Sequence, residues 1–333
     1  MATLRDVSRE SGYSVTTVSR ALNGFDDVNE ATKNHIQEVA KRLNYQPNIN
    51  AKNLVMQNSN RIGFIIFEFG QASGEDNFVY EMMVGMQEKC VSSGHELLFL
   101  FGSIHLDEKK HENIEAIIKK YGLAGIVLMG CSTNSITHDE LKKISRPVVC
   151  IDGDLQTEYV GSVSVDNYQA AYDAVNYLKN VKHRKNILLL NGKENSFACQ
   201  ERMRGYKDAL GKDFSEKNIY YGEYSEQISY QAINGLFDSD FAYDGIFACS
   251  DMMAVGAINA LLSHHIEVGN QVDVIGFDNI PLSSYIQIPL TTVNQDKVML
   301  GEKAVTLLLD IINGNSENRK IIVPHKIVYR AST

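Results

Sequence analysis

The sequence predicts an α/β protein: a small three-helix domain at the N-terminus, followed by doubly wound parallel sheets. Two observations carry this prediction. Residues 1–47 hold three short helical patterns, each with its own cap or stop residue. From residue 61 onward, short apolar runs alternate with segments of helical period, as in parallel sheets covered on both faces. At 333 residues the chain is long enough for two or three domains with cores of their own.

The first two helical patterns are separated by a tight turn. Thr3 is a predicted N-cap, Gly12 marks the turn, and Ser14 caps the second helix. The inward positions are apolar: Leu4, Val7, Val18, Ala21 and Leu22. The outer face of the second helix carries Val15, Thr16, Thr17, Ser19 and Arg20. A polar outer face next to a tight turn is typical of a helix-turn-helix that reads the major groove of DNA.

Asn29 caps a third predicted helix, and Pro47 prevents its continuation. Its apolar residues follow the helical period and share a small core with the first two helices: Ile36, Val39, Ala40 and Leu43. A helical bundle without a nucleic-acid role is the plainer interpretation of this segment. Charge favours the DNA interpretation only weakly. Residues 1–60 carry seven basic and six acidic side chains, whereas the rest of the chain carries 25 basic and 35 acidic side chains and would repel a phosphate backbone.

Residues 2–54 resemble the headpiece of the lactose/galactose-repressor (LacI/GalR) family. Two ordered motifs carry the resemblance, Thr16-Thr17-Val18-Ser19-Arg20 and Asn44-Tyr45-Gln46-Pro47-Asn48. Further motifs extend the resemblance over nearly the whole chain: Ser164–Asn167, Arg202–Tyr206, Ser250–Ala257, Val274–Asp278 and Leu290–Gln295. The resemblance implies a transcriptional regulator that binds operator DNA as a homodimer and represses a carbohydrate operon under the control of a small sugar or sugar phosphate. The DNA-contacting residues it implies are Val15, Thr16, Thr17, Arg20, Asn23, Tyr45, Asn50, Lys52 and Leu54.

The resemblance also implies a domain plan. Residues 1–47 form the DNA-binding headpiece, and residues 48–60 form a hinge helix and linker whose Leu54 enters the minor groove at the operator centre. An inert linker is the alternative for that segment. Residues 61–333 form a periplasmic-binding-protein-like core of two subdomains around an effector cleft, about 61–161 with 296–322 and about 162–295 with 323–333. The crossovers near 162, 295 and 322 would act as the hinge of a clamshell.

Apolar runs and helical periods outline the core. The predicted strands are Ile62–Phe67, Glu96–Phe101, Gly125–Met129, Pro147–Ile151, Ser162–Val165, Asn186–Leu190, Gly245–Cys249 and Val272–Gly276. The predicted helices are Phe78–Ser92, Tyr168–Asn180, Arg202–Leu210, Tyr230–Phe237 and Asp251–His264.

Composition favours a cytoplasmic protein. No apolar run follows a charged start, and no stretch approaches the length that crosses a bilayer. The five cysteines form no CxxC pair and are interpreted as buried free thiols: Cys90, Cys131, Cys150, Cys199 and Cys249.

The sequence predicts neither an enzyme nor a cofactor or metal site. Gly205–Asp213 looks like a phosphate loop, but its glycines are one residue too far apart and Asp213 replaces the required Ser or Thr. The segment is interpreted as a helix C-terminus. The histidine pairs do not place two metal ligands on one face beside a third.

Five effector residues follow from matches to family cleft positions: Arg202, Tyr224, Ser250, Asp278 and Gln295. Asp152 aligns with a cleft aspartate of some relatives, and Phe78 is a candidate for the wall of the first subdomain. A sugar needs charged or amide groups for its hydroxyls and an aromatic face for its C–H surface. Asp278 ends an apolar strand, where a carboxylate projects into the crevice. For Asp152 a strand-end turn, and for Phe78 a place in the core, are the plainer alternatives. Asp278, Arg202 and Tyr224 are expected to come from one subdomain, so the contact from the other subdomain is expected from Gln295 at the hinge and from the wall around Phe67–Phe78.

Two other interpretations stay open. A regulator of the same family could use a purine or a phosphoprotein as co-repressor. A sugar-binding transport receptor shares the clamshell core, but it would need an export signal and would lack the headpiece.

Overall fold

The computed structural model describes residues 2–22, 28–43, 45, 59–66, 76–100, 113–133, 135–238, 241–315 and 317–333. The chain divides into two compact units, Met1–Ser59 and Asn60–Thr333. Each unit has a hydrophobic core of its own.

The first unit contains the three predicted helices, α1 (Leu4–Ser11), α2 (Val15–Leu22) and α3 (Glu30–Arg42). The predicted caps are confirmed. Thr3 caps α1 in a capping box with Asp6, and the Thr17 N–H donates to Ser14 Oγ at 3.1 Å. The Thr32 N–H donates to Asn29 Oδ1 at 2.9 Å at the start of α3. The shared core is buried: Val7, Val18, Ala21, Val28, Ile36, Val39 and Ala40.

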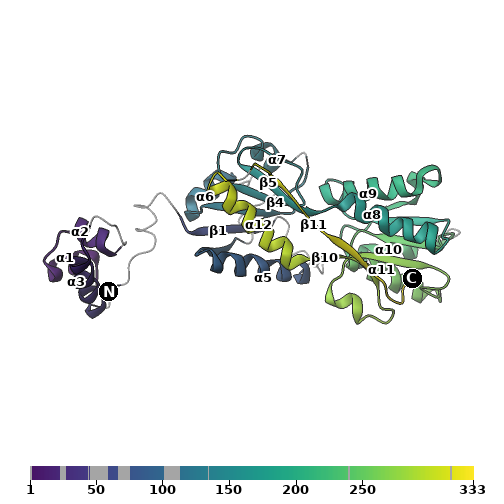
Figure 1. Ribbon diagram of the computed structural model, residues 1–333. Coiled ribbons are helices and arrows are strands. Elements are labelled where there is room, and N and C mark those ends of the chain that lie inside the picture. The colour runs from purple at the N-terminus through teal and green to yellow at the C-terminus, as the bar shows by residue number, and fades with distance from the viewer. Residues whose placement is uncertain are drawn as a thin grey trace. The chain divides into compact units, whose positions relative to one another are not determined.

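The second unit is built on two six-stranded sheets (Figure 1). The first sheet is parallel throughout, in the order β11 (Lys320–Val323), β5 (Val160–Val165), β4 (Val148–Ile151), β3 (Gly125–Met129), β1 (Arg61–Ile66), β2 (Glu96–Leu100). The second has the order β12 (His325–Val328), β10 (Thr291–Gln295), β9 (Asp273–Asp278), β8 (Gly245–Ala248), β6 (Ile187–Asn191), β7 (Ile219–Tyr221). Only β12 is antiparallel to its neighbour in this sheet.

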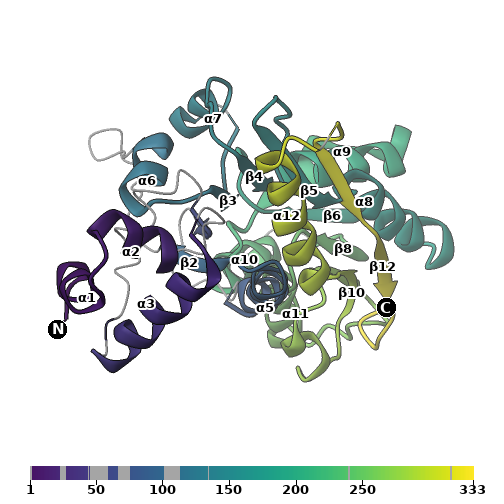
Figure 2. The same ribbon diagram turned by 60° about the vertical axis from the view of Figure 1, so that its left-hand side comes forward.

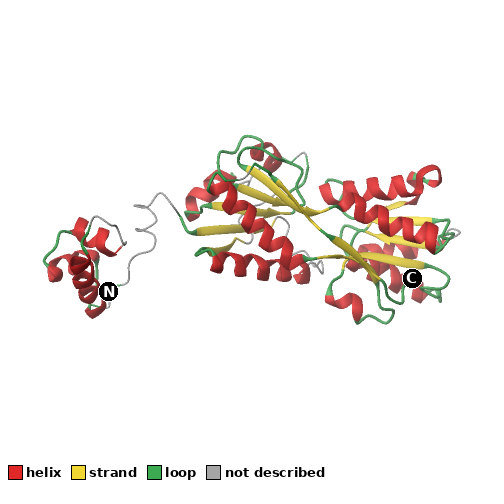
Figure 3. Cartoon of the chain, viewed as in Figure 1, coloured by secondary structure: helices red, strands yellow, loops and turns green. Residues whose placement is uncertain are grey.

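Helices cover both faces of each sheet, so the doubly wound prediction is confirmed (Figure 3). The first sheet has α5 (Asp76–Ser92) and α12 (Lys297–Ile312) on one face and α6 (Ile114–Tyr121) and α7 (Ile136–Leu141) on the other. The second sheet is covered by α8 (Asn167–Asn176) and α9 (Phe197–Leu210), and by α10 (Glu226–Gly235) and α11 (Asp251–Ser263). No helix in the described part of the chain is long and apolar enough to cross a membrane.

Helices α5 and α12 lie side by side (Figure 2). Two glycines permit this close packing. A Cβ on Gly85 would lie 1.9 Å from the Val298 carbonyl oxygen, and a Cβ on Gly301 would lie 2.0 Å from that of Met82. Any larger residue at either position would push the helices apart.

The chain passes between the sheets three times, after β5, after β10, and between β11 and β12. The three crossings lie within a few residues of the predicted points. Val160–Val165 is paired with both β4 and β11 in the first sheet, so the first crossing follows Val165, and the last falls at Pro324. The apolar pattern alone could not place these points to the residue, because a buried parallel strand has the same apolar pattern in either sheet.

Candidate functional site

The outer face of α2 presents three of the four DNA-contact residues predicted on that helix. Val15, Thr16 and Arg20 are exposed, whereas Val18 and Ala21 on the opposite side are buried. Thr17 is half-buried, and its hydroxyl lies 2.9 Å from Ser14 Oγ within the helix cap. The helix therefore offers side chains of groove-reading type on one side while its other side is fixed by the core.

Tyr45 is half-buried and packs against the core of the first unit. Its N–H donates to the Ala40 carbonyl at 2.9 Å, so it closes the end of α3. The other predicted DNA-contact residues, Asn23, Asn50, Lys52 and Leu54, lie outside the described residues, as does the predicted hinge helix.

In the second sheet the strand order reverses between β6 and β8, and ligands of such folds bind at the carboxyl ends of the strands near this point. The predicted effector residues of the second subdomain gather at these ends. Ser250 follows β8, Asp278 ends β9 and Gln295 ends β10. Arg202 comes from α9, and Tyr224 from the turn before α10.

Arg202 is the centre of the cluster and is 3 % exposed. Its Nε donates to Asn167 Oδ1 at 2.8 Å, and its Nη1 donates to the Cys249 carbonyl at 2.6 Å. The guanidinium lies 3.6 Å from the centroid of the Phe277 ring. Burial acts to lower the pKa of Arg202, but the negative charge of Asp278 and other neighbours outweighs it and raises the pKa. Arg202 forms no ion pair with a described residue, and no described group accepts from Nη2.

Asp278 and Gln295 form a pair beside it. Gln295 Nε2 donates to Asp278 Oδ1 at 2.7 Å, while Gln295 Oε1 is buried without a hydrogen-bond partner. Burial raises the pKa of Asp278 to about 6, although the charges of Arg202 and Lys297 and the Gln295 bond act to lower it. A buried acceptor left unpaired is costly and marks a place where a ligand or water can donate.

Asp152 brings the first subdomain to this cluster. It follows β4 of the first sheet, and its Oδ1 accepts from Asn167 Nδ2 at 2.9 Å. Because Asn167 also accepts from Arg202, one amide links the two subdomains. Burial raises the pKa of Asp152, against the positive charge of Arg202 and the Asn167 bond. The Asn167 role was missed from the sequence, although the motif Ser164–Asn167 contained the residue.

The remaining predicted residues differ in what they can offer. Tyr224 is half-buried, and its hydroxyl lies 2.7 Å from Cys199 Sγ and 3.2 Å from Ser196 Oγ. Ser250 is 5 % exposed and caps α11 by accepting from the Met253 N–H. Phe78 on α5 is 6 % exposed and belongs to the hydrophobic core, which leaves a ligand little of its surface.

The backbone is strained at three of the predicted effector residues. Asp152, Tyr224 and Asp278 have φ values of 52°, 59° and 111°, a region that residues with a Cβ rarely adopt. Such strain persists only where the surrounding structure enforces it, and it concentrates at functional sites.

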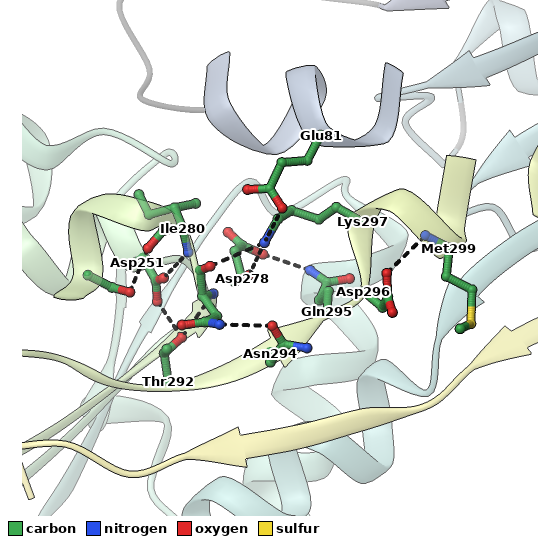
Figure 4. A network of polar contacts seen from close by, with 12 residues as sticks. Glu81, Asp251, Asp278, Ile280, Thr292, Asn294, Gln295, Asp296, Lys297 and Met299 are labelled. Carbon is green, nitrogen blue, oxygen red and sulfur yellow. Dashed lines mark hydrogen bonds and ion pairs between the residues drawn. The ribbon is translucent and has the colours of Figure 1, made fainter. Parts of the chain in front are cut away.

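A polar network connects Asp278 with the first subdomain (Figure 4). Lys297, the first residue of α12, is 3 % exposed and donates to the carbonyl oxygens of Asp278 and Asn279 at 2.8 Å and 3.2 Å. Its Nζ also lies 3.5 Å from Glu81 Oε2 on α5. Lys297 was not predicted as a site residue, because a lysine at the start of a helix has no distinguishing sequence signal.

Asp251 holds the neighbouring loop. Its Oδ2 accepts from the Ile280 N–H at 2.8 Å, and its Oδ1 accepts from the Thr292 hydroxyl. Both contacts are drawn in Figure 4. Burial, reinforced by the charge of Asp278, raises the pKa of Asp251 well above its ordinary value. Among the residues that the structure describes, no group of three His, Cys, Asp or Glu side chains could hold a metal ion.

Comparison with known proteins supports both units. The family described as "Bacterial regulatory proteins, lacI family" matches residues 3–48, and a "Periplasmic binding protein-like domain" matches residues 175–333. The chain is 30% identical to the HTH-type transcriptional regulator MalR of Clostridium butyricum over 99% of this chain and 98% of that protein. It is also 30% identical to catabolite control protein A of Priestia megaterium over 99% of each chain.

Solved structures share the fold. The Lac repressor dimer bound to operator and the anti-inducer ONPF superimposes with a TM-score of 0.83 at 22% identity, over 99% of this chain and 98% of that one. The complex of the transcriptional regulator CelR with cellobiose gives a TM-score of 0.75 at 24% identity over the whole of both chains.

Proposed function

Because this chain belongs to the lacI family of bacterial regulatory proteins, it is a DNA-binding transcriptional regulator, and we propose that a small neutral sugar controls it from the Arg202 cluster. One observation carries the proposal. The buried Arg202 guanidinium interacts electrostatically with two carboxylates, Asp278 and Asp152, and forms an ion pair with neither in the part of the chain described. The missing contacts are those that a hydroxyl-rich ligand would make.

The hydrogen-bonding atoms left over suit a polyol. Arg202 Nη2 can donate, while Asp278 Oδ2 and Asp152 Oδ2 can accept, since neither oxygen has a described partner. Gln295 Oε1 is a fourth polar atom without a described partner. A sugar hydroxyl both donates and accepts, so neighbouring hydroxyls can satisfy this mixed set, whereas a purely apolar ligand would leave every member unpaired. The Tyr224 ring is placed to cover a sugar's C–H face.

The charges favour a neutral sugar over a sugar phosphate. Asp278 and Asp152 already place two carboxylates around the single guanidinium, and Lys297 is engaged by Glu81 and two carbonyl oxygens. A phosphate would add further negative charge to a cluster in which two carboxylates already outnumber the single guanidinium.

The DNA side of the proposal rests on α2. Val15, Thr16 and Arg20 read base edges in the major groove, and two headpieces of a homodimer address two half-sites. The Lac repressor structure of the same fold is a dimer bound to its operator, which supports the same assembly for this chain. We infer that the protein acts in the cytoplasm, where operator DNA is found, and that it represses genes for carbohydrate use.

Coupling between the sites follows the Lys297 network. A ligand held by Asp278 and Asp152 contacts both subdomains, and Lys297 ties the Asp278 backbone to α5 through Glu81. A ligand shifts the DNA-competent population only by its different affinity for the two subdomain arrangements.

A thermal-shift screen of the full chain tests the proposal. Neutral mono- and disaccharides, the matching sugar phosphates and purines are compared, because a ligand that binds only the folded state raises its melting temperature. A shift from a neutral sugar, lost in Asp278→Ala and kept in Asp213→Ala, supports the proposal. A shift from purines or phosphorylated compounds alone overturns it. Asp278→Ala is further expected to bind operator like wild type while ignoring the sugar.

A further inference from the structure

An open pocket of about 370 Å³ lies on the second subdomain, outside the effector cluster. It is formed where α8 and the strand β12 lie side by side (Figure 2). Its walls include Asp173, Asn176, Tyr177, Val181, Lys326 and Tyr329, and we call it the tyrosine pocket. A volume of this size is typical of small-molecule sites, and no residue that lines the pocket belongs to the Arg202 cluster.

The backbone beside the pocket is irregular where α8 ends. The chain continues into a π-helix, η1 (Tyr177–Val181), and the Lys182 N–H donates to the Tyr177 carbonyl at 3.0 Å. The next residue, His183, has a φ of 58°, a region that residues with a Cβ rarely adopt. π-Helical turns are rare and occur frequently at functional sites. This one supplies two wall residues of the pocket, Tyr177 and Val181, so the unusual backbone and the pocket coincide.

Two tyrosine rings form an aromatic corner in the pocket. The ring centroids of Tyr177 and Tyr329 are 4.8 Å apart, and the ring planes are inclined at 47° to each other. Tyr329 is 58 % exposed and Val181 is 59 % exposed, so apolar surface of the pocket is open to solvent. A planar aromatic ligand can bury this surface, because contacts between aromatic rings are favourable in offset and edge-to-face arrangements.

The uncommitted polar groups of the pocket include two nitrogen donors. Both oxygens of Asp173 have a partner, because Oδ1 accepts from Gln169 Nε2 at 2.8 Å and Oδ2 lies 3.1 Å from His325 Nε2. Asn176 Oδ1 already accepts from a neighbouring amide at 2.7 Å, which leaves the Asn176 amide nitrogen. Within the described ranges, neither this nitrogen nor the exposed Lys326 ammonium has a hydrogen-bond or ion-pair partner. Two donors, one of them charged, suit a carboxylate.

We propose that the tyrosine pocket is a second small-molecule site, which binds an aromatic carboxylate. The aromatic ring of the ligand packs against Tyr177 and Tyr329, and its carboxylate accepts from Lys326 Nζ and Asn176 Nδ2. The strand β12 begins directly after the crossing at Pro324, so the ligand contacts the second subdomain beside one of the three passages between the sheets. The site uses no residue of the effector cluster and does not depend on control by a sugar.

Calorimetric titration of the full-length protein tests the proposal with benzoate, 4-hydroxybenzoate and phenylacetate as probes. At least one of them should bind with a dissociation constant below about 1 mM. Benzyl alcohol lacks the charge and cyclohexanecarboxylate lacks the aromatic ring, so each should bind at least about tenfold more weakly than that probe.

Variants with matched controls locate the binding. Lys326→Gln should weaken binding of the probe at least about tenfold, whereas Lys320→Gln, an exposed lysine on β11 outside the pocket, should leave it unchanged. Tyr329→Ala should weaken it to a similar extent, and its control is Tyr285→Ala, because the Tyr285 side chain is 84 % exposed and lies outside the pocket.

Three outcomes would overturn the proposal. The first is that none of the three probes binds below about 1 mM. The second is that Lys326→Gln and Tyr329→Ala bind the probe like wild type, which would locate it elsewhere on the protein. The third is that benzylamine binds as tightly as the carboxylates, because a cation would be recognised by Asp173 and not by Lys326. Asp278→Ala should bind the probe like wild type, so failure of the sugar screen would leave this measurement unchanged.

Discussion

Replacing Asp278 by Asn keeps the size of the side chain and removes its titratable charge. Gln295 Nε2 can still donate to the oxygen of an asparagine, so the Gln295 bond is retained. In the wild-type protein the Asp278 carboxylate is partly buried, and burial raises its pKa from 3.8 to about 6. The ionised form is therefore less favourable in the folded protein than in the unfolded chain.

The sign and size of the effect follow from this shift. The pKa of Asp278 in the folded protein lies above its value in the unfolded chain. The protonated Asp278 therefore contributes fully to the stability of the fold below the unfolded pKa, and this contribution is lost as pH rises through about 6. One pKa unit corresponds to about 1.4 kcal/mol, and partial exposure of Asp278 reduces the sum, so the ionised carboxylate costs roughly 1–3 kcal/mol above the folded pKa. Asp278→Asn should recover that free energy.

Unfolding of the full chain by denaturant, followed by circular dichroism, measures the change. Asp278→Asn is expected to be more stable than wild type near about pH 7.5, with a difference that shrinks toward about pH 4. Asp213→Asn is the matched control. The hydrogen bond and charge of Lys179 lower the pKa of Asp213, so removing this carboxylate should slightly destabilise the folded protein. A variant that is less stable at neutral pH, or a difference independent of pH, would refute the reasoning about the cluster.

The remaining predictions concern DNA, coupling and pH. Arg20→Ala should cost ~1–3 kcal/mol per half-site on operator and little on random DNA, measured by titration; an equal loss on both would indicate a phosphate contact. Leu54→Ala should reduce operator bending in a gel-shift assay, and unchanged bending would contradict the wedge. Lys297→Met should bind sugar yet lose most of the ~1–3 kcal/mol by which sugar changes operator affinity; a wild-type change would exclude Lys297 from coupling. Sugar affinity, measured by calorimetry, should fall as pH drops through about 6, because a protonated Asp278 accepts weaker hydrogen bonds from the sugar than the carboxylate does; an affinity independent of pH would contradict a sugar contact by Asp278.

Local sequence patterns predicted the helix caps and the strands well. Thr3, Ser14 and Asn29 were placed correctly because a cap depends on a hydroxyl or amide and a few neighbouring N–H groups. Four described strands, β7 (Ile219–Tyr221), β10, β11 and β12, were missed, since each is only three to five residues long and carries little periodicity. Gly211 was interpreted correctly as the end of a helix, with a φ of 59° and an N–H bonded to the Lys207 carbonyl.

The site was less accessible to sequence reasoning. Arg202, Asp278 and Gln295 came from resemblance, and their joint position is a tertiary fact that no spacing reveals. The expected contact from the first subdomain was assigned to Gln295 and the Phe67–Phe78 wall. In the structure the first subdomain reaches the Arg202 cluster through Asp152, which accepts from Asn167, while Gln295 belongs to the second sheet. Asn167 and Lys297 act at the crossovers themselves, where the polypeptide changes sheets and simple periodicity ends.

The way the chain returns to the first sheet has a consequence for its synthesis. Strands β1 to β5 leave the ribosome early. The sheet face on which α5 packs is completed only when α12 is made, and the edge beside β5 is completed only when β11 is made. Met82 and Phe64 therefore become fully buried only after much later residues have been made. In contrast, β6 to β10 and their helices emerge one after another. The later-made subdomain is expected to close first, leaving the earlier one as an apolar intermediate that depends on rapid completion of the chain or on a chaperone.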